Sequence, residues 1–295
     1  MTTQVAHCIV VGVDGSPASD AALDWAAAEA ARRHRRLHLC SVGERQVYGN
    51  EAALYVAEVV DQIVADAIAR ADAVLDAAVA RVGERQPQLE VTRESSLGVP
   101  AAILVEHSTQ AETIVVGHRG HGVLVGALLG SVAHQVAAHA SCPVVVVRDP
   151  GDDVVPTGGV VVGVDGSAGS EAAVGFAFEG ASSRGCGLHV VKAWWTSTAG
   201  LMPSIKLEFQ TAERLAVSET IVGWVDKYPD LVVEVTVPMA PTVSALVRAG
   251  TGAELLVVGN RGLGGFRRLA MGSVSHGVLQ HATCPVAVVG DAHDD

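Results

Sequence analysis

The sequence predicts an α/β protein built from two tandem domains, each a parallel sheet flanked by helices. Three observations predict this class: an internal repeat, an alternation of short Val/Ile/Leu runs with longer Ala-rich segments, and a length of 295 residues, which is typical of two ordinary domains. Nearly continuous apolar strands indicate burial on both faces. Parallel strands joined by right-handed helical crossovers satisfy that requirement.

The repeat is visible at both ends of each half. The segment IVVGVDGS at 9–16 returns as VVVGVDGS at 160–167, which is 151 residues further along, and HASCPV at 139–144 returns as HATCPV at 281–286, which is 142 residues further along. The second half is therefore nine residues shorter in its middle, where a loop tolerates a change in length.

The elements of the first half follow in order. Strands are expected near 9–13, 37–42, 89–92, 113–116 and 144–147, with helices between them. The stretch 149–158 is rich in Pro, Gly and Asp and is interpreted as the linker, which gives domains at 1–149 and 158–291. The nine extra residues are assigned to 43–58, a segment with Tyr48 and Tyr55 that either covers a ligand or contacts a partner.

Composition excludes several classes of function. A formal net charge of -12 argues against a nucleic acid as the main partner. No apolar run approaches the roughly 18 residues of a membrane span, and the first residues lack the pattern of a secretory signal, so a cytoplasmic location is expected. Five widely spread cysteines are interpreted as reduced core residues without disulfides.

Ligands of open parallel sheets bind at the carboxyl ends of the strands. Asp14 and Asp165 each follow the first strand of their half. Ser16, followed by Pro17, and Ser167 are expected to cap the next helices, so each Asp lies in a strand-to-helix turn. Asp14 either accepts turn amides only or also contacts a ligand, and its recurrence beside a glycine-rich loop favours a ligand.

That glycine-rich loop is the second repeated motif. Gly-x2-Gly-x9-Gly-Ser occurs at 117–131 and again at 259–273 with identical spacing. Its last glycine and serine are expected to start a helix whose free amides favour phosphate, with Arg119 and Arg261 adding charge. A purely structural loop is the alternative. Neither a P-loop nor the dinucleotide-binding G-x-G-x-x-G occurs in the sequence.

On these motifs both halves resemble the universal stress protein family, in its ATP-binding branch. The resemblance covers nearly the whole chain. The tandem arrangement and the repeated motifs are similar to those of the two-domain stress proteins of mycobacteria and related actinobacteria. It implies adenine-nucleotide α-hydrolase-like domains, each a five-stranded parallel sheet in the order 3-2-1-4-5. It also implies ATP, with or without Mg²⁺, across the carboxyl ends of the strands.

The resemblance assigns roles residue by residue. Asp14 would contact the adenine or ribose end, and the main chain of Val42 would contact adenine, with Ala193 as its counterpart in the second half. Ribose and phosphates would be held by Gly117, Arg119, Gly120, Gly130, Ser131 and Val132. The second site would use Asp165, Gly259, Arg261, Gly262, Gly272, Ser273 and Val274.

Two further expectations concern partners and asymmetry. Family members commonly pair through the last strand, here 144–147 and 286–289, which would join either the two halves of one chain or two chains in a homodimer. Arg267 and Arg268 occupy the second loop where the first has Val125 and Gly126. We expect weaker phosphate binding in the first site unless these arginines face solvent.

Three further groups of residues have both a functional and a structural interpretation. The pairs His139 with Cys142 and His281 with Cys284 offer two ligands each, too few for structural zinc, and no metal site is predicted from them. His118 and His121 are assigned a loop role, toward phosphate rather than a metal. The adjacent tryptophans at 194–195 either stack on adenine or form a packed aromatic pair.

The leading functional prediction is a cytoplasmic, ATP-binding regulator of stress response, linked by resemblance to growth arrest or hypoxia, with an unspecified protein partner. An enzyme that hydrolyses ATP or transfers its nucleotidyl group is the alternative. Both glycine loops lack Asp and Glu, so slow hydrolysis at most is expected. A partner-binding module that has lost its nucleotide is the third possibility.

Overall fold

The computed structural model describes residues 5–43, 57–121, 129–148, 158–195, 203–262 and 271–290. The chain divides into two compact units, Met1–Val147 and Arg148–Asp295, and each is described by itself. No described helix combines the length and the apolar character needed to cross a bilayer.

The first unit alternates strands and helices along the chain. Its strands are β1 (Ile9–Gly12), β2 (Leu37–Gly43), β3 (Val91–Leu97), β4 (Thr113–Gly117) and β5 (Val144–Val147). Its helices are α1 (Pro17–Arg33), α2 (Ala57–Arg85), α3 (Pro100–His107) and α4 (Ser131–His139).

The second unit repeats the same series of elements. Its strands are β6 (Gly158–Gly163), β7 (Leu188–Val191), β8 (Val233–Thr236), β9 (Ala253–Gly259) and β10 (Val286–Val289). Its helices are α5 (Ala168–Arg184), α6 (Pro203–Lys227), α7 (Thr242–Ala249) and α8 (Ser273–His281).

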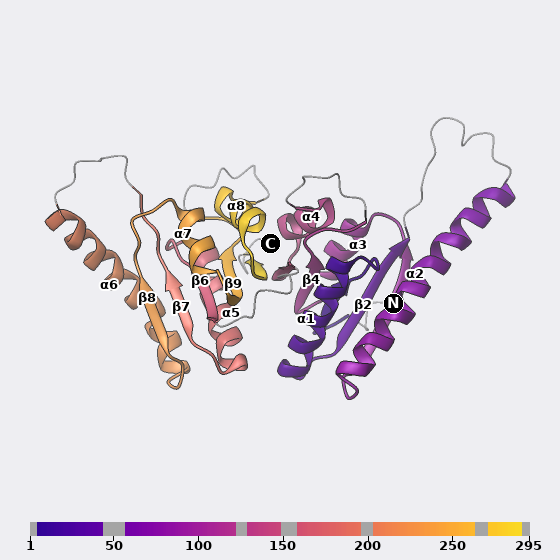
Figure 1. Ribbon diagram of the computed structural model, residues 1–295, viewed down its shortest axis with the longest axis horizontal. Helices are drawn as coiled ribbons and strands as arrows, with labels where there is room; N and C mark the ends of the chain where they lie inside the picture. The colour runs from indigo at the N-terminus through magenta and orange to yellow at the C-terminus, as the bar shows by residue number, and fades with distance from the viewer. Residues whose placement is uncertain are drawn as a thin grey trace. The chain divides into compact units, whose positions relative to one another are not determined.

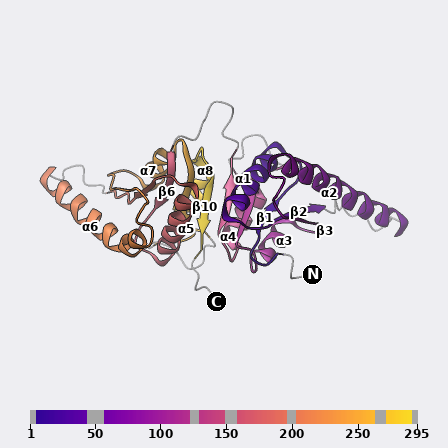
Figure 2. The same cartoon turned by 90° about the horizontal axis from the view of Figure 1, so that it is seen from below.

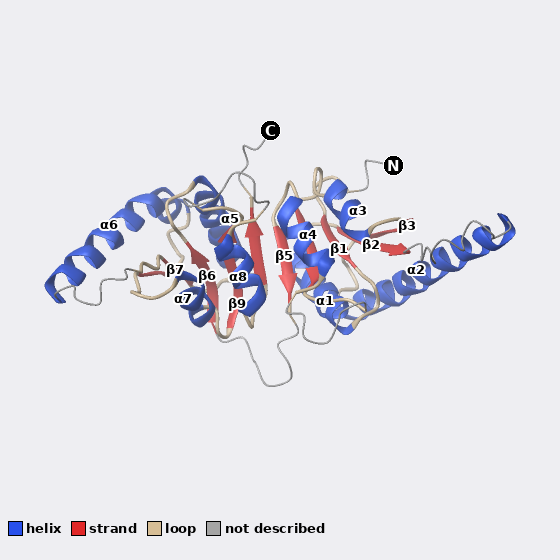
Figure 3. Cartoon of the chain, turned by 90° about the horizontal axis from the view of Figure 1, so that it is seen from above, coloured by secondary structure: helices blue, strands red, loops and turns tan. Residues whose placement is uncertain are grey.

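Each sheet has the predicted strand order. The first runs β3-β2-β1-β4-β5 and the second runs β8-β7-β6-β9-β10, with every pair within a unit parallel. In the first unit α1 and α2 cover one face of the sheet while α3 and α4 cover the other (Figures 1 and 2). Figure 3 shows the same three layers, with strands between helices in each unit. The predicted α/β class is confirmed.

The central strands form the core because they are apolar on both faces. All residues of β5 and β10 are buried, as are Ile114, Val115 and Val116 of β4. This burial explains why short Val-rich runs located these strands in the sequence.

The predicted position of the third strand is wrong. The sequence pattern predicts this strand near 89–92, whereas β3 spans Val91–Leu97. It is an edge strand with the sequence VTRESSL, and most of its residues are half-buried. Edge strands commonly carry polar residues, and β3 is polar from Thr92 to Ser96. The apolar residues that suggested a strand at 89–92 therefore mark only the beginning of β3.

Several predicted features lie outside the described residues. These are most of the linker, from 149 to 157, the inserted segment from 44 to 56 with both of its tyrosines, and the loop positions 125–126 and 267–268.

Candidate functional site

The first strand of each unit ends in a turn organised by an aspartate. In the first unit the Ser16 amide donates to Asp14 Oδ1 at 2.9 Å. The Ser16 hydroxyl accepts from the Ser19 amide at 3.2 Å, and Pro17 occupies the first helical turn of α1. The predicted helix cap is confirmed, and Asp14 has the turn-amide role that its position suggests.

The second unit repeats this turn. The Ser167 amide and hydroxyl donate to Asp165 Oδ1 at 2.9 and 2.6 Å. The Ser167 hydroxyl oxygen also accepts from the Ser170 amide at 3.3 Å, which caps α5. The predicted cap at Ser167 is confirmed as well.

Each aspartate also faces the glycine loop that follows β4 or β9. Asp14 Oδ2 accepts from the His121 amide at 3.3 Å. A methyl group at Gly120 would collide with that oxygen, and one at Gly262 would collide with Asp165 Oδ2. Only glycine lets the loop backbone approach the carboxylate this closely.

The carboxyl of Asp14 is kept ionised by its neighbours. Partial desolvation raises its pKa, but hydrogen bonds from Ser16, Ser19 and the His121 amide together outweigh desolvation and hold the pKa below its usual value. A fixed negative charge therefore lies beside the loop at neutral pH.

The helices that follow the glycine loops begin without a side-chain cap. Gly130 and Gly272 are the N-caps of α4 and α8, and among the described residues no side chain forms a capping hydrogen bond at either helix start. Their own amides donate back to His118 O at 2.8 Å and Asn260 O at 2.9 Å. The first-turn amides, at 131–132 and 273–274, lack intrahelical acceptors and lie at the positive end of a helix dipole.

A cavity of about 510 Å³ opens beside this turn and helix start in the second unit. Its size lies within the roughly 300–1,000 Å³ of small-molecule sites. Seven of the eight residues predicted for the second site line it: Asp165, Gly259, Arg261, Gly262, Gly272, Ser273 and Val274.

Other wall residues were not anticipated from the sequence. An apolar wall is formed by Val191, Leu246, Val258 and Met271. Ala193, the predicted adenine contact, is not among the lining residues, whereas Val191 is, two positions earlier. Ala193 does correspond to Val42 by strand register, because Gly12 pairs with Cys40 as Gly163 pairs with Val191.

One polar atom in this wall lacks a partner. Asn260 lines the cavity, and its Oδ1 is buried without a hydrogen bond among the described residues. Ser275 supports the same loop, since its hydroxyl lies 2.9 Å from both Asn260 O and Gly272 O. A buried acceptor without a donor favours a ligand group that supplies one.

The first unit contains the same loop motif with the same spacing, with His118 where the second unit has Asn260. Arg119 is exposed, and Gly117, His118 and Gly120 are half-buried at the end of β4. Gly130 and Ser131 begin α4, and Val132 follows in its first turn. Val42 lies near the end of β2 and pairs with Ser96.

The weighed histidine and tryptophan pairs have local partners. The Nδ1 atoms of His139 and His281 lie 2.9 and 2.8 Å from carbonyl oxygens of their own helices. Trp194 packs on Phe209, with ring centroids 4.6 Å apart, whereas Trp195 is 63% exposed. Trp194 therefore packs against α6 and does not form a pair with Trp195.

Fold and site together define a tandem α/β protein with a cavity at the carboxyl ends of the parallel strands in its second unit. The universal stress protein family matches residues 7–148 and 158–290, and the chain belongs to this family. A universal stress protein of Mycobacterium tuberculosis is 36% identical over 293 residues, covering 96% of each chain. One from Mycolicibacterium smegmatis is 37% identical over 290 residues, covering 95% of this chain and 96% of the relative.

A solved structure shows the same fold over the whole chain. The crystal structure of a universal stress protein from Archaeoglobus fulgidus superposes with a TM-score of 0.72 at 21% identity, covering 96% of this chain and 98% of that one. The predicted family and the tandem arrangement of its domains are confirmed.

Proposed function

We propose that each unit binds ATP at the carboxyl ends of its strands, and that nucleotide occupancy makes the chain a regulator in stress response or growth arrest. Such a regulator would act in the cytoplasm, where ATP is abundant, through a protein partner. The proposal rests above all on the cavity of the second unit, where an aspartate turn, a glycine loop and an uncapped helix start converge.

The cavity wall combines polar and apolar residues. Amides of Ser273 and Val274 at the start of α8 would receive the phosphates, and Arg261 would add positive charge. The apolar wall of Val191 and Leu246 suits an adenine ring, with Asp165 beside the ribose.

The first unit would use the equivalent groups. Ser131 and Val132 begin α4 as their counterparts begin α8, and Asp14 occupies the same turn as Asp165. An acidic chain needs such local devices, because its net charge of -12 repels a polyanion at long range.

We further propose that turnover is at most slow. The loops at 117–131 and 259–273 contain no Asp or Glu, so neither a base nor a carboxylate ligand for Mg²⁺ comes from them. A hydrolysis assay with Mg²⁺ should give less than one turnover per chain per minute. Faster turnover would favour the enzyme alternative.

Proline offers a direct test of the proposed phosphate contact. Ser273→Pro removes the amide at the first position of α8, where proline is tolerated. The preceding Gly272 already has φ −71° and ψ 155°, the extended backbone that precedes proline readily. Loss of one charge-assisted hydrogen bond should weaken ATP binding to this unit by about tenfold to a hundredfold.

Ala168→Pro is the matched control. It removes the corresponding amide of α5, a helix capped by Ser167, and the first unit already has Pro17 at this position. ATP affinity of the control should equal that of the wild type. If calorimetry gave the wild type, Ser273→Pro and Ala168→Pro the same ATP affinity, the proposed contact between phosphate and the Ser273 amide would be contradicted. Absence of ATP binding to the wild type would favour a partner-binding module without a nucleotide.

A further inference from the structure

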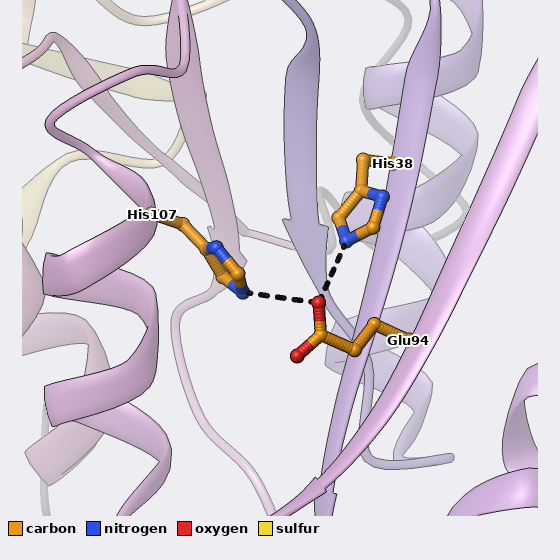
Figure 4. Close-up of side chains that lie close together, drawn as sticks. All are labelled: His38, Glu94 and His107. Atoms are coloured by element: carbon orange, nitrogen blue, oxygen red, sulfur yellow. Dashed lines mark ion pairs between the residues drawn. The ribbon is translucent and has the colours of Figure 1, made fainter. Parts of the chain in front are cut away.

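A cluster of two histidines and one glutamate lies in the first unit, and none of its residues belongs to the glycine loop at 117–131 (Figure 4). His38 is the second residue of β2, Glu94 belongs to β3, and His107 ends α3. One ligand atom from each lies within 4.8 Å of the others. We propose that this cluster binds a divalent metal ion of the zinc class.

His38 is built as a ligand. Its side chain is fully buried, and its Nε2 points at the Glu94 carboxylate and has no hydrogen-bond partner among the described residues (Figure 4). Its Nδ1 lies 2.8 Å from Thr92 Oγ1. If Nδ1 donates to that hydroxyl, Nε2 carries the lone pair, which is the arrangement found around metal-binding histidines.

Glu94 and His107 complete the set. Glu94 Oε1 accepts from the Ser96 hydroxyl at 2.8 Å, which orients the carboxylate. Its Oε2 lies 3.9 Å from both His38 Nε2 and His107 Nε2. The Glu94 and His107 side chains are 25% and 14% exposed, so both are in contact with solvent, which would supply a fourth ligand as water.

A direct ion pair explains these distances less well. Neither imidazole Nε2 reaches hydrogen-bond distance of the carboxylate, and both are buried without a hydrogen-bond partner in the part of the chain that the structure describes. Zinc bonds of about 2.0–2.2 Å place tetrahedral ligands about 3.4 Å apart. An inward shift of roughly half an ångström at each His–Glu pair, and of up to about 1.4 Å between the two imidazole nitrogens, would therefore give each of these nitrogens a bond.

The charge state of His38 agrees with this geometry. Burial lowers the pKa of His38, and the neighbouring His107 acts in the same direction. The Glu94 carboxylate acts in the opposite direction, but the net lowering of the pKa favours the neutral imidazole, which is the form that binds metal ions.

The second unit provides an internal comparison. Strand register aligns His38 with His189 and Glu94 with Thr236, and the last residue of α7 is Ala249 where α3 has His107. His189 Nε2 lies 2.7 Å from Thr236 Oγ1 and is satisfied by that hydroxyl. We expect one metal ion per chain, bound in the first unit.

The site would have a structural consequence. His107 comes from a helix, whereas the other two ligands come from β2 and the edge strand β3. A bound ion would fasten α3 to the open edge of the sheet. Zinc should therefore raise the thermal midpoint of the first unit.

The experiment is metal titration of the full chain with Zn²⁺ and Co²⁺, followed by calorimetry and visible absorption. The wild type should bind one ion, and Co²⁺ should show the spectrum of a nitrogen and oxygen ligand set without a thiolate band. His107→Ala and Glu94→Gln should weaken binding by at least about a hundredfold, the upper range for loss of an outer-shell partner. His107→Ala introduces the residue that the second unit already has.

Two further variants complete the test. His139→Ala removes an exposed histidine of α4 and should leave stoichiometry and affinity unchanged. Thr236→Glu combined with Ala249→His should raise the stoichiometry to two ions per chain. Absence of stoichiometric binding by the wild type, or unchanged affinity after His107→Ala, would overturn the metal site.

Discussion

The two units keep the same turns at the carboxyl ends of their strands but pack their helices differently. The Ser amide lies 2.9 Å from the Asp oxygen in both turns, and the glycine-cap amide donates to the loop over 2.8 Å in one unit and 2.9 Å in the other. In the helix layer, by contrast, Asp24 of α1 corresponds to Gly175 of α5.

Charges join α1 to α2 in the first unit. Arg81 donates through Nε to Asp24 Oδ1 at 2.8 Å and through Nη2 to Oδ2 at 2.7 Å, and Arg85 adds a contact to Asp24 at 2.9 Å. The ionised Asp24 raises the pKa of Arg81 through its hydrogen bond. This interface is a bidentate ion pair at the edge of the helix layer.

Aromatic rings join α5 to α6 in the second unit. Phe178 is fully buried and lies 5.9 Å from the Trp224 ring and 6.0 Å from the Tyr228 ring, between centroids. Gly175 makes room, since a methyl group there would lie 2.8 Å from Trp224. The difference teaches that helix packing admits several chemical solutions, whereas the turns that shape the site depend on backbone geometry and admit few.

The largest expected effect tests the aromatic interface. Phe178→Ala should lower the free energy of unfolding of the second unit by about 3–5 kcal/mol, because it empties a fully buried site. Phe209→Ala, on the 43% exposed Phe209 of the same unit, is the control and should cost much less. Urea unfolding followed by tryptophan fluorescence measures both, and equal losses would contradict the comparison.

The shared turns are tested next. Gly117→Ala and Gly259→Ala place a methyl group within 3 Å of the α1 and α5 backbones and should each cost about 1–3 kcal/mol of stability. Gly83→Ala and Gly223→Ala are matched controls, since both glycines lie in helices with open space around them. Alanine should stabilise those helices by up to about 1 kcal/mol. Similar changes at all four positions in urea unfolding would mean that the turns are not constrained.

The charged interface should respond less than the aromatic one. Arg81→Met should cost the first unit about 0.5–1 kcal/mol, because the pair is partly exposed. The loss should shrink at high salt. Arg85→Met, at a 58% exposed arginine that forms its ion pair with Asp24, should cost less still. Urea unfolding at two salt concentrations measures the loss of unfolding free energy in each variant. A loss for Arg81→Met as large as that for Phe178→Ala would contradict the expected order.

The smallest effect concerns pH. The folded state holds the pKa of Asp14 below its ordinary value of about 4. Its ionised form therefore stabilises the first unit above that pH, and this contribution is lost as the pH falls through the lowered pKa. Asp14→Asn should be less stable than wild type at pH 7, and the gap should close in acid. A gap that is constant across unfolding curves from pH 7 to pH 3 would contradict the assignment.

Sequence reasoning found the turns and glycine loops because their backbone geometry restricts the residue types. Glycine at 120 and 262 is required where the loop meets a carboxylate, so the requirement is visible as a repeated letter. The cavity wall was not predictable in this way. Val191 and Leu246 line it, yet an apolar wall residue has the same pattern as a core residue.

The histidine and glutamate cluster was also invisible in the sequence. His38 lies 56 residues before Glu94, and Glu94 lies 13 residues before His107, so the three meet through the pairing of β2 with β3 and the packing of α3. Metal motifs are recognised by short spacings, and this cluster has none. The short-spaced pairs are His139 with Cys142 and its repeat in the second unit. His139 and His281 contact carbonyl oxygens of their own helices, and the Cys142 thiol donates to the neighbouring Pro143 carbonyl.

The central claim is that two uncapped helix starts each hold the phosphates of one nucleotide. Calorimetric titration of the full chain with ATP, repeated with AMP, tests it most directly. We predict two ATP molecules per chain and much weaker binding of AMP, which lacks the phosphates that reach the helix amides. Absence of heat with ATP, or equal affinity for AMP, would contradict the account.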